Sequence, residues 1–144
     1  MRKHFHIPNA DPEGGQRFLS VLGFDSILPI DGRRGDRIDG ALRKRAATMH
    51  VAALADKEPQ RRFTIARAAF LGWANDADSS HLVTAAITRD QQASRAFAAE
   101  IIAPIGYIRT KAGNRILSNH GVQQIAETLN APVGAVKYQA ANGG

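Results

Sequence analysis

The side chains best suited to ligate a metal in this chain are its five histidines, because the sequence contains no cysteine. The lack of cysteine excludes disulfides and cysteine-based zinc ribbons. His4 and His6 are close enough in sequence to hold a metal together, but the sequence indicates no third metal ligand for them. We therefore interpret both as surface residues. His81 follows a run of small and polar residues, and we expect a surface or structural role for it. The histidines alone therefore predict no metal site.

The second chemical feature is positive charge. The chain has 19 Lys and Arg residues against 13 Asp and Glu, a formal charge of +6 and a sequence pI near 10.3. This balance leaves nucleic acid or another polyanion open as a partner. Residues 31–37 combine both charges with two glycines, but they lack the spacing of a phosphate-binding loop and the Gly-Lys-Ser/Thr that completes one. We therefore expect a solvated loop there.

Length and hydropathy predict one cytoplasmic domain. A chain of 144 residues with 44% hydrophobic residues can bury a core without disulfides or metals. No apolar run approaches the length of a membrane span, and no charged leader precedes a long apolar core. We expect a loop-rich lead-in over residues 1–37, with a short helix at 16–22. The remaining residues, 38–142, form the principal part of the same compact domain.

Two strands are predicted next, over residues 38–45 and 48–54, joined at Ala46 and Ala47. In the second, Met49 and Val51 alternate with polar or small residues, the period of a half-buried strand. Residues 82–87 are apolar and are expected to be extended. A small antiparallel sheet or hairpin is therefore the β part of the fold.

A helix over residues 61–73 follows the sheet. Phe63, Ala66, Phe70 and Trp73 recur at spacings of three and four, which is typical of a helix with one face in a core. Pro59 lies just before it, where a helix can begin. Periodicity alone indicates no more than a core helix.

Another helix is predicted between Thr88 and Pro104. Thr88 and Gln91 have the spacing of a capping box, in which each side chain bonds a free backbone N–H at the helix start. Ala96, Phe97 and Ile101 continue a helical stripe, and Pro104 ends it.

Three more helices are expected toward the C-terminus. The first runs from Pro104 to Gly113; Ser118 caps the second, and Asn130 ends it in a left-handed conformation. Pro132 begins the third. The last two resemble a helix-turn-helix pair, but the final helix offers only Lys137, Tyr138 and Gln139 for nucleic-acid contacts. We favour a structural pair, with Lys137 and Gln139 as the candidates if nucleic acid binds.

Two of these segments resemble signatures of the ImmA/IrrE family of metallo-endopeptidases. Residues 61–66, Arg-Arg-Phe-Thr-Ile-Ala, are similar to the run that leads into His-Glu-x-x-His in that family, and residues 96–104 are similar to its alanine-rich helix ending in proline. With the helical tail, the resemblance covers about residues 38–142. It implies an α+β fold: a small antiparallel sheet packed by several helices, a zincin-like minimal scaffold with a helical C-terminal pair.

The catalytic motif itself is replaced. Arg67 and Leu71 stand where the family has its zinc-ligating histidines, and Ala68 stands where it has the glutamate base. A guanidinium and an isobutyl group offer a metal no lone pair. We expect no cofactor, and the resemblance implies a vacated cleft whose lining candidates are Arg67, Phe70, Asp90, Phe97 and Glu100. A buried Arg67 needs a counterion, which we predict to be Asp90 or Glu100.

The leading functional hypothesis is a catalytically inactive ImmA/IrrE-like domain that binds a protein, such as a repressor-type regulator, in transcription or stress response. One alternative is a basic nucleic-acid-binding protein that uses its C-terminal helix pair. The other is a metallopeptidase with zinc held by unusual ligands such as His81, His50 or Asp90. The sequence does not predict an oligomeric state.

Overall fold

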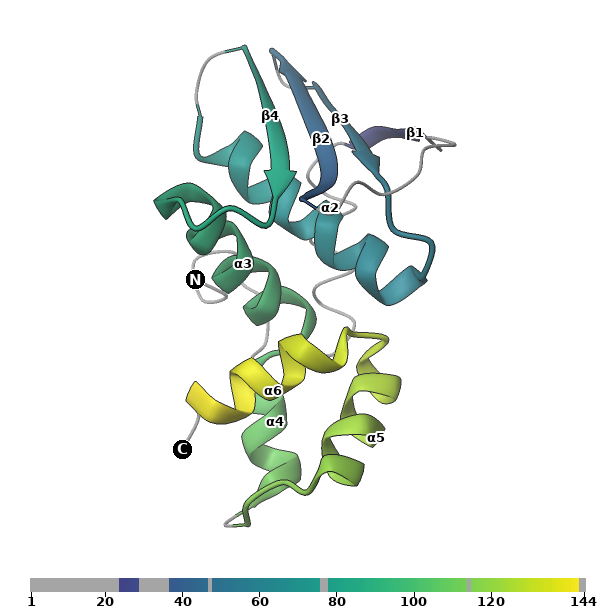
Figure 1. Cartoon of the computed structure of the whole chain (residues 1–144), viewed down its shortest axis with the longest axis vertical. Coiled ribbons are helices and arrows are strands. Elements are labelled where there is room, and N and C mark those ends of the chain that lie inside the picture. The colour runs from purple at the N-terminus through teal and green to yellow at the C-terminus, as the bar shows by residue number, and fades with distance from the viewer. Residues whose placement is uncertain (1–23, 29–36, 47, 76–77, 114, 143–144) are drawn as a thin grey trace.

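The computed structural model describes residues 24–28, 37–46, 48–75, 78–113 and 115–142 (Figure 1). These residues form four strands and five helices. In chain order the elements are β1 (Phe24–Leu28), β2 (Ile38–Arg45), β3 (Thr48–Ala53), α2 (Glu58–Trp73), β4 (Ser79–Thr84), α3 (Arg89–Ile102), α4 (Ile105–Ala112), α5 (Asn119–Leu129) and α6 (Val133–Asn142). The predicted α+β class is confirmed.

The sheet has the strand order β1-β3-β2-β4. The strand β2 pairs in antiparallel fashion with both β3 and β4, whereas β1 pairs in parallel with β3. The two predicted strands form the predicted hairpin, with Ala46 in the turn at a φ of 50°. The sequence did not reveal β1, which lies within the predicted lead-in. The fourth strand begins at Ser79 rather than at residue 82, because a strand at the sheet edge tolerates polar residues that carry no apolar signal.

The helix α2 lies between the sheet and α3, packing against β2, β3, β4 and α3. For that reason every residue from Thr64 to Ala69 is buried, Arg67 included. The prediction of a helix with one buried face was wrong, since two sides are covered. Trp73, expected in the core, is 48% exposed at the end of the helix. Alanine at three of these six positions lets both neighbours approach closely.

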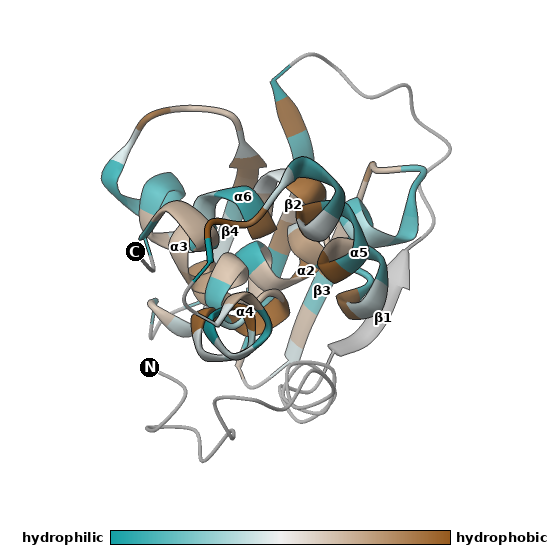
Figure 2. Cartoon of the chain, turned by 90° about the horizontal axis from the view of Figure 1, so that it is seen from below, coloured by the Kyte–Doolittle hydropathy of each residue, from teal (hydrophilic) through white to brown (hydrophobic). Residues whose placement is uncertain are grey.

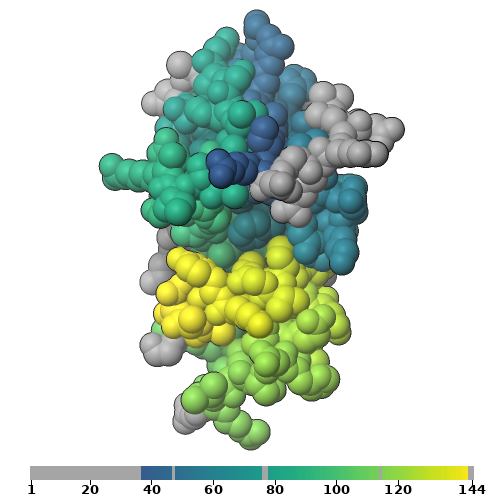
Figure 3. All heavy atoms as spheres, in the orientation of Figure 1, coloured from purple at the N-terminus to yellow at the C-terminus, as the bar shows by residue number. Residues whose placement is uncertain are grey.

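The helices α4, α5 and α6 form the opposite end of the molecule, where α6 lies across the front between the sheet end and α5 (Figure 3). Seen from below, α4 and α5 show hydrophobic residues beside hydrophilic ones, as amphipathic helices do (Figure 2). The predicted caps are confirmed. The Ser118 hydroxyl accepts from the Gly121 N–H at 3.1 Å, and Asn130 ends α5 in the left-handed conformation with φ 46°.

Two hydrogen-bonded contacts join this helical end to the rest of the domain. The guanidinium of Arg62 donates from Nη1 to the carbonyls of Leu129 at 3.1 Å and Asn130 at 2.9 Å, at the C-terminal end of α5. The buried Gln139 of α6 donates from Nε2 to Oε2 of Glu100 in α3 at 2.7 Å. The C-terminal helices are thus held to α2 and α3 by polar contacts as well as by apolar packing.

Several predictions fall outside the described residues: the histidine pair His4 and His6, the helix at 16–22 and nearly all of the loop at 31–37. Among the helices that the structure describes, none has the length and apolar character needed to cross a bilayer.

Candidate functional site

Arg67, in the middle of α2, is the central side chain of the site and is 3% exposed. Its Nη1 donates to Oδ2 of Asp39 at 2.7 Å, and the same contact is an ion pair. Its Nη2 donates to the Thr84 carbonyl at 2.6 Å and to Oε1 of Gln91 at 2.8 Å. Its Nε lies 3.3 Å from Oγ of Ser94. One guanidinium therefore connects α2, the start of β2, the end of β4 and the first turns of α3.

The predicted partner of Arg67 was wrong, although the prediction that a carboxylate pairs with it is confirmed. The counterion is Asp39, at an irregularity in the pairing of β2 with β4. Asp90 is exposed in the first turn of α3. Glu100 lies further along α3, where its Oε2 accepts from the backbone N–H of Ile105 and from Gln139. Asp39 was missed because it is distant in sequence from both signatures.

Gln91 closes part of the free edge of β4. Its Nε2 donates to the Leu82 carbonyl at 2.7 Å, and its Oε1 accepts from the Thr84 N–H at 3.0 Å. A carbonyl and an N–H two residues apart on one strand edge are the groups that an added strand would bond. The side-chain amide takes the place of such a strand. The predicted cap is confirmed at Thr88, whose Oγ1 accepts from the Gln91 N–H. The reciprocal half of the predicted capping box was wrong, because the Gln91 side chain bonds β4 and Arg67 instead.

The electrostatics of the site follow from burial. Removal from water lowers the pKa of Arg67 below its usual value, the charge and hydrogen bond of Asp39 oppose that shift, and the charge of Arg95 adds to it. Arg95 donates to the carbonyls of Thr84 at 3.3 Å and Ala86 at 2.9 Å. Two guanidinium groups thus meet at the Thr84 carbonyl, close to the carboxylate of Asp39.

The other two residues that we compared with the peptidase motif, Ala68 and Leu71, are packed in the core. Ala68 is fully buried and Leu71 is 2% exposed, both within the apolar core. Arg67 uses all of its donor nitrogens in contacts with protein groups and has no acceptor, so its side chain can neither ligate a cation nor remove a proton from water. The contacts of Arg67 therefore support a structural role for this residue.

The remaining cleft candidates do not surround one cavity. Phe70 and Phe97 pack ring against ring, with centroids 5.4 Å apart, and Phe97 is 1% exposed. Phe97 is therefore core. A groove of about 810 Å³ does lie beside these residues, between α2, α3 and α6, with Phe63, Arg95 and Tyr138 among its lining.

The histidines considered for a zinc site lie on the sheet. His50 on β3 and His81 on β4 both border a shallow groove across β2, β3 and β4. Within the described part of the chain, no three His, Asp or Glu side chains stand close enough to hold a metal together.

The two nucleic-acid candidates on α6 have different surroundings. Both border a groove between α4 and α6, but Lys137 is exposed, whereas Gln139 is 6% exposed and bound to Glu100. Gln139 is thus a buried link to α3 and is not available to a base edge.

The residues missed by sequence reasoning are Asp39, Gln91 and Ser94. Ser94 is fully buried and donates to the Gln91 carbonyl at 2.8 Å while it accepts from Arg67. Of these three residues, only Gln91 was indicated by the sequence, through its capping-box spacing from Thr88.

Comparisons of the chain with protein-family models, with curated proteins and with solved structures found no match in any of the three.

Proposed function

We propose that this chain is a catalytically inactive, ImmA/IrrE-like cytoplasmic domain that works by binding a protein, such as a repressor-type regulator, in transcription or stress response. The observation that carries the proposal is the arrangement around Arg67. Its guanidinium faces Ser94 and Gln91, which precede Phe97 by one turn and by nearly two turns of α3. In the family that the sequence resembles, an acidic zinc ligand lies in that part of the helix. Here both side chains are neutral, and an ion pair with Asp39 fills the space.

Loss of catalysis follows from the chemistry of these groups. A zinc peptidase needs a metal to polarise the scissile carbonyl and a base to activate water. Arginine, alanine and leucine at positions 67, 68 and 71 supply neither function. Retained packing between α2 and α3 leaves the protein a rigid surface on which binding can persist without hydrolysis.

The proposal is tested by separating binding from cleavage. The purified chain is mixed with a purified repressor-type regulator, the complex is resolved by size-exclusion chromatography, and the intact mass of the regulator is measured. We expect a complex in which the mass of the regulator is unchanged. Zinc content, measured by elemental analysis before and after incubation with excess zinc, should stay far below one ion per chain. One zinc per chain together with chelator-sensitive shortening of the regulator would refute the proposal in favour of the unusual-ligand peptidase.

Nucleic-acid binding is the second candidate function, supported by the net charge of +6. Phosphate contacts release counterions, so genuine binding to a duplex must weaken steeply as salt rises. Retention of a DNA duplex with such a slope, without a protein complex, would favour this alternative. The burial of Gln139 leaves Lys137 and Tyr138 as the exposed polar candidates on α6.

A further inference from the structure

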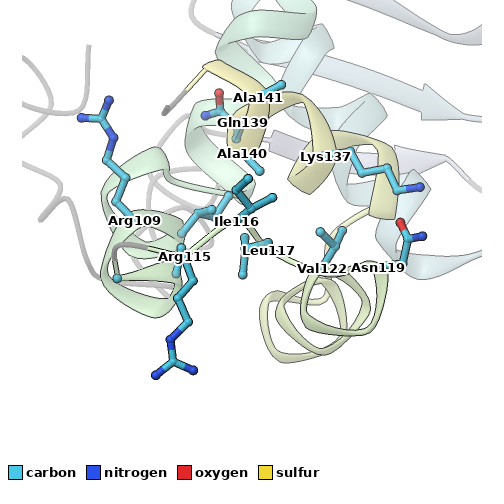
Figure 4. Close-up of a pocket in the computed structure, with 13 residues that line it drawn as sticks. Arg109, Arg115, Ile116, Leu117, Asn119, Val122, Lys137, Gln139, Ala140 and Ala141 are labelled. Carbon is cyan, nitrogen blue, oxygen red and sulfur yellow. The ribbon is translucent and has the colours of Figure 1, made fainter.

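A groove of about 600 Å³ lies at the helical end of the molecule, between α4, the segment that follows it and α6. Ile116, Leu117 and Val122 occupy the middle of this groove in Figure 4, with Arg115 on one side and Lys137 on the other. It is separate from the Arg67 centre, whose contacts lie among α2, β2, β4 and α3.

The middle of the groove is apolar and includes a fully exposed residue. Ile108 and Val122 are 2% and 5% exposed and form its floor, whereas Ile116 beside them is 100% exposed. A single exposed isoleucine is unremarkable on a protein surface. An exposed isoleucine that continues an apolar groove is a feature of binding surfaces, because a partner that covers it removes apolar area from water.

The rim of the groove is positively charged. Arg115 and Lys137 are exposed there, and no Asp or Glu is among the described residues that line it. Between residues 105 and 142 the one acidic residue of the sequence is Glu127, which borders a different pocket on α4 and α5. The charge of the groove is therefore complementary to an anionic occupant.

The lining also distinguishes between two kinds of anionic occupant. Single-stranded nucleic acids bind by stacking their bases on aromatic side chains, and none of the described residues in this groove is aromatic. A duplex presents phosphates but little apolar surface to a floor such as Ile108 and Val122. An amphipathic peptide with acidic residues offers both an apolar face and carboxylates, and helices of this kind commonly bind in apolar grooves.

We propose that this groove binds an acidic amphipathic segment of a partner protein. Its apolar side chains cover Ile116 and Leu117, and its carboxylates face Arg115 and Lys137. The inference rests on the proposed function in that the ligand is a protein, but it does not depend on the Arg67 centre.

The test uses fluorescence anisotropy of the full chain with three labelled probes. The first is a helical peptide of about 18 residues, or five turns, with leucine on one face and glutamate on the other. The second replaces each glutamate by lysine, and the third is a short DNA duplex. We expect the acidic peptide to bind and the other two probes not to bind. The affinity for the acidic peptide should fall as salt rises, because exposed charges are screened.

Two variants assign the binding to the groove. Ile116→Ser removes apolar contact and should weaken the acidic peptide about tenfold. Lys137→Glu reverses a rim charge and should weaken it about fivefold. Leu82→Ser and Arg43→Glu are the matched controls, because both residues are exposed on the sheet, away from the helical end. Their affinities should equal that of the wild type, and circular dichroism checks that all four variants fold.

Three results would overturn the inference: equal binding of the basic peptide, binding of the duplex without the acidic peptide, or groove variants that bind as the wild type does. Failure of the proposed function is distinguishable from failure of this inference, because it would be detected as zinc bound to the chain and cleavage of the regulator. Neither of those measurements involves the groove.

Discussion

The Arg67 guanidinium and the Asp39 carboxylate are 2.7 Å apart and join the middle of α2 to the start of β2 across the interior of the domain. Their side chains are 4% and 19% exposed, so water screens the pair only weakly. Each group makes the burial of the other tolerable, because an unpaired charge in such a place is costly.

Removing Arg67 should therefore destabilise the fold. We expect Arg67→Met to lower the free energy of unfolding by about 3 kcal/mol, because Asp39 is left without its counterion. Arg67→Lys should recover only part of this loss, since an ammonium cannot reproduce the planar fork that reaches Asp39, Thr84 and Gln91. Urea denaturation of the two variants measures both changes in the free energy of unfolding.

The control for that experiment is the surface pair of Arg61 with Glu58, whose charged atoms are 3.7 Å apart on exposed side chains. Arg61→Met should change stability by less than about 0.5 kcal/mol. Equal losses for the two arginine variants would show that the Arg67 centre contributes no more than a surface contact does.

The contribution of Arg67 to the free energy of unfolding should not change with pH near neutrality. Burial lowers its pKa below the usual value, with Asp39 opposing the shift, but an arginine stays protonated in both the folded and the unfolded chain between about pH 6 and 9. Only in strongly alkaline solution does the unfolded state hold this proton more tightly, and there stability should rise with pH. The stability difference between wild type and Arg67→Met, measured at several pH values, should stay constant through the neutral range. A steep dependence of this difference on pH in the neutral range would contradict the expectation that Arg67 stays protonated there.

Gln91 should protect the edge of β4. In Gln91→Ala the Thr84 N–H loses its 3.0 Å partner and the Leu82 carbonyl loses its 2.7 Å donor, so we expect a loss of about 1 to 3 kcal/mol. Hydrogen exchange read by NMR should show faster exchange at the Thr84 amide. Gln92→Ala is the matched control at the exposed neighbouring position, and it should leave that amide unchanged. Unaltered exchange in Gln91→Ala would mean that another group covers this edge.

Gly40 should resist any side chain. A Cβ at this position would collide with the Ala52 carbonyl oxygen and lie 2.9 Å from Cγ2 of Thr64. Because backbone atoms of β3 cannot easily move away, Gly40→Ala should cost about 2 kcal/mol. Gly134→Ala in α6 meets no atom within 4 Å and should gain about 0.5 kcal/mol from its higher helix propensity. Thermal unfolding of both variants tests the contrast, and a stabilised Gly40→Ala would show that the strand and α2 can separate.

The sequence by itself determined the local structure of this protein. The hairpin around Ala46, the cap at Ser118, the left-handed Asn130 and the end of α3 before Pro104 were predictable, because each depends on residues within one or two turns of one another. Alternation and capping signals act over such distances. The chemistry of a guanidinium also indicated that Arg67, if buried, requires a carboxylate.

Only the tertiary structure decided which carboxylate that is, and what surrounds the site. Asp39 and Arg67 are separated by 28 residues, and the packing of α2 against β2 brings them together. The addition of β1 to the sheet, the burial of α2 on two sides and the bond of Gln139 to Glu100 likewise arise from contacts between distant elements. Local periodicity carries no record of such contacts, because it reports which face of an element is apolar and not which element covers it.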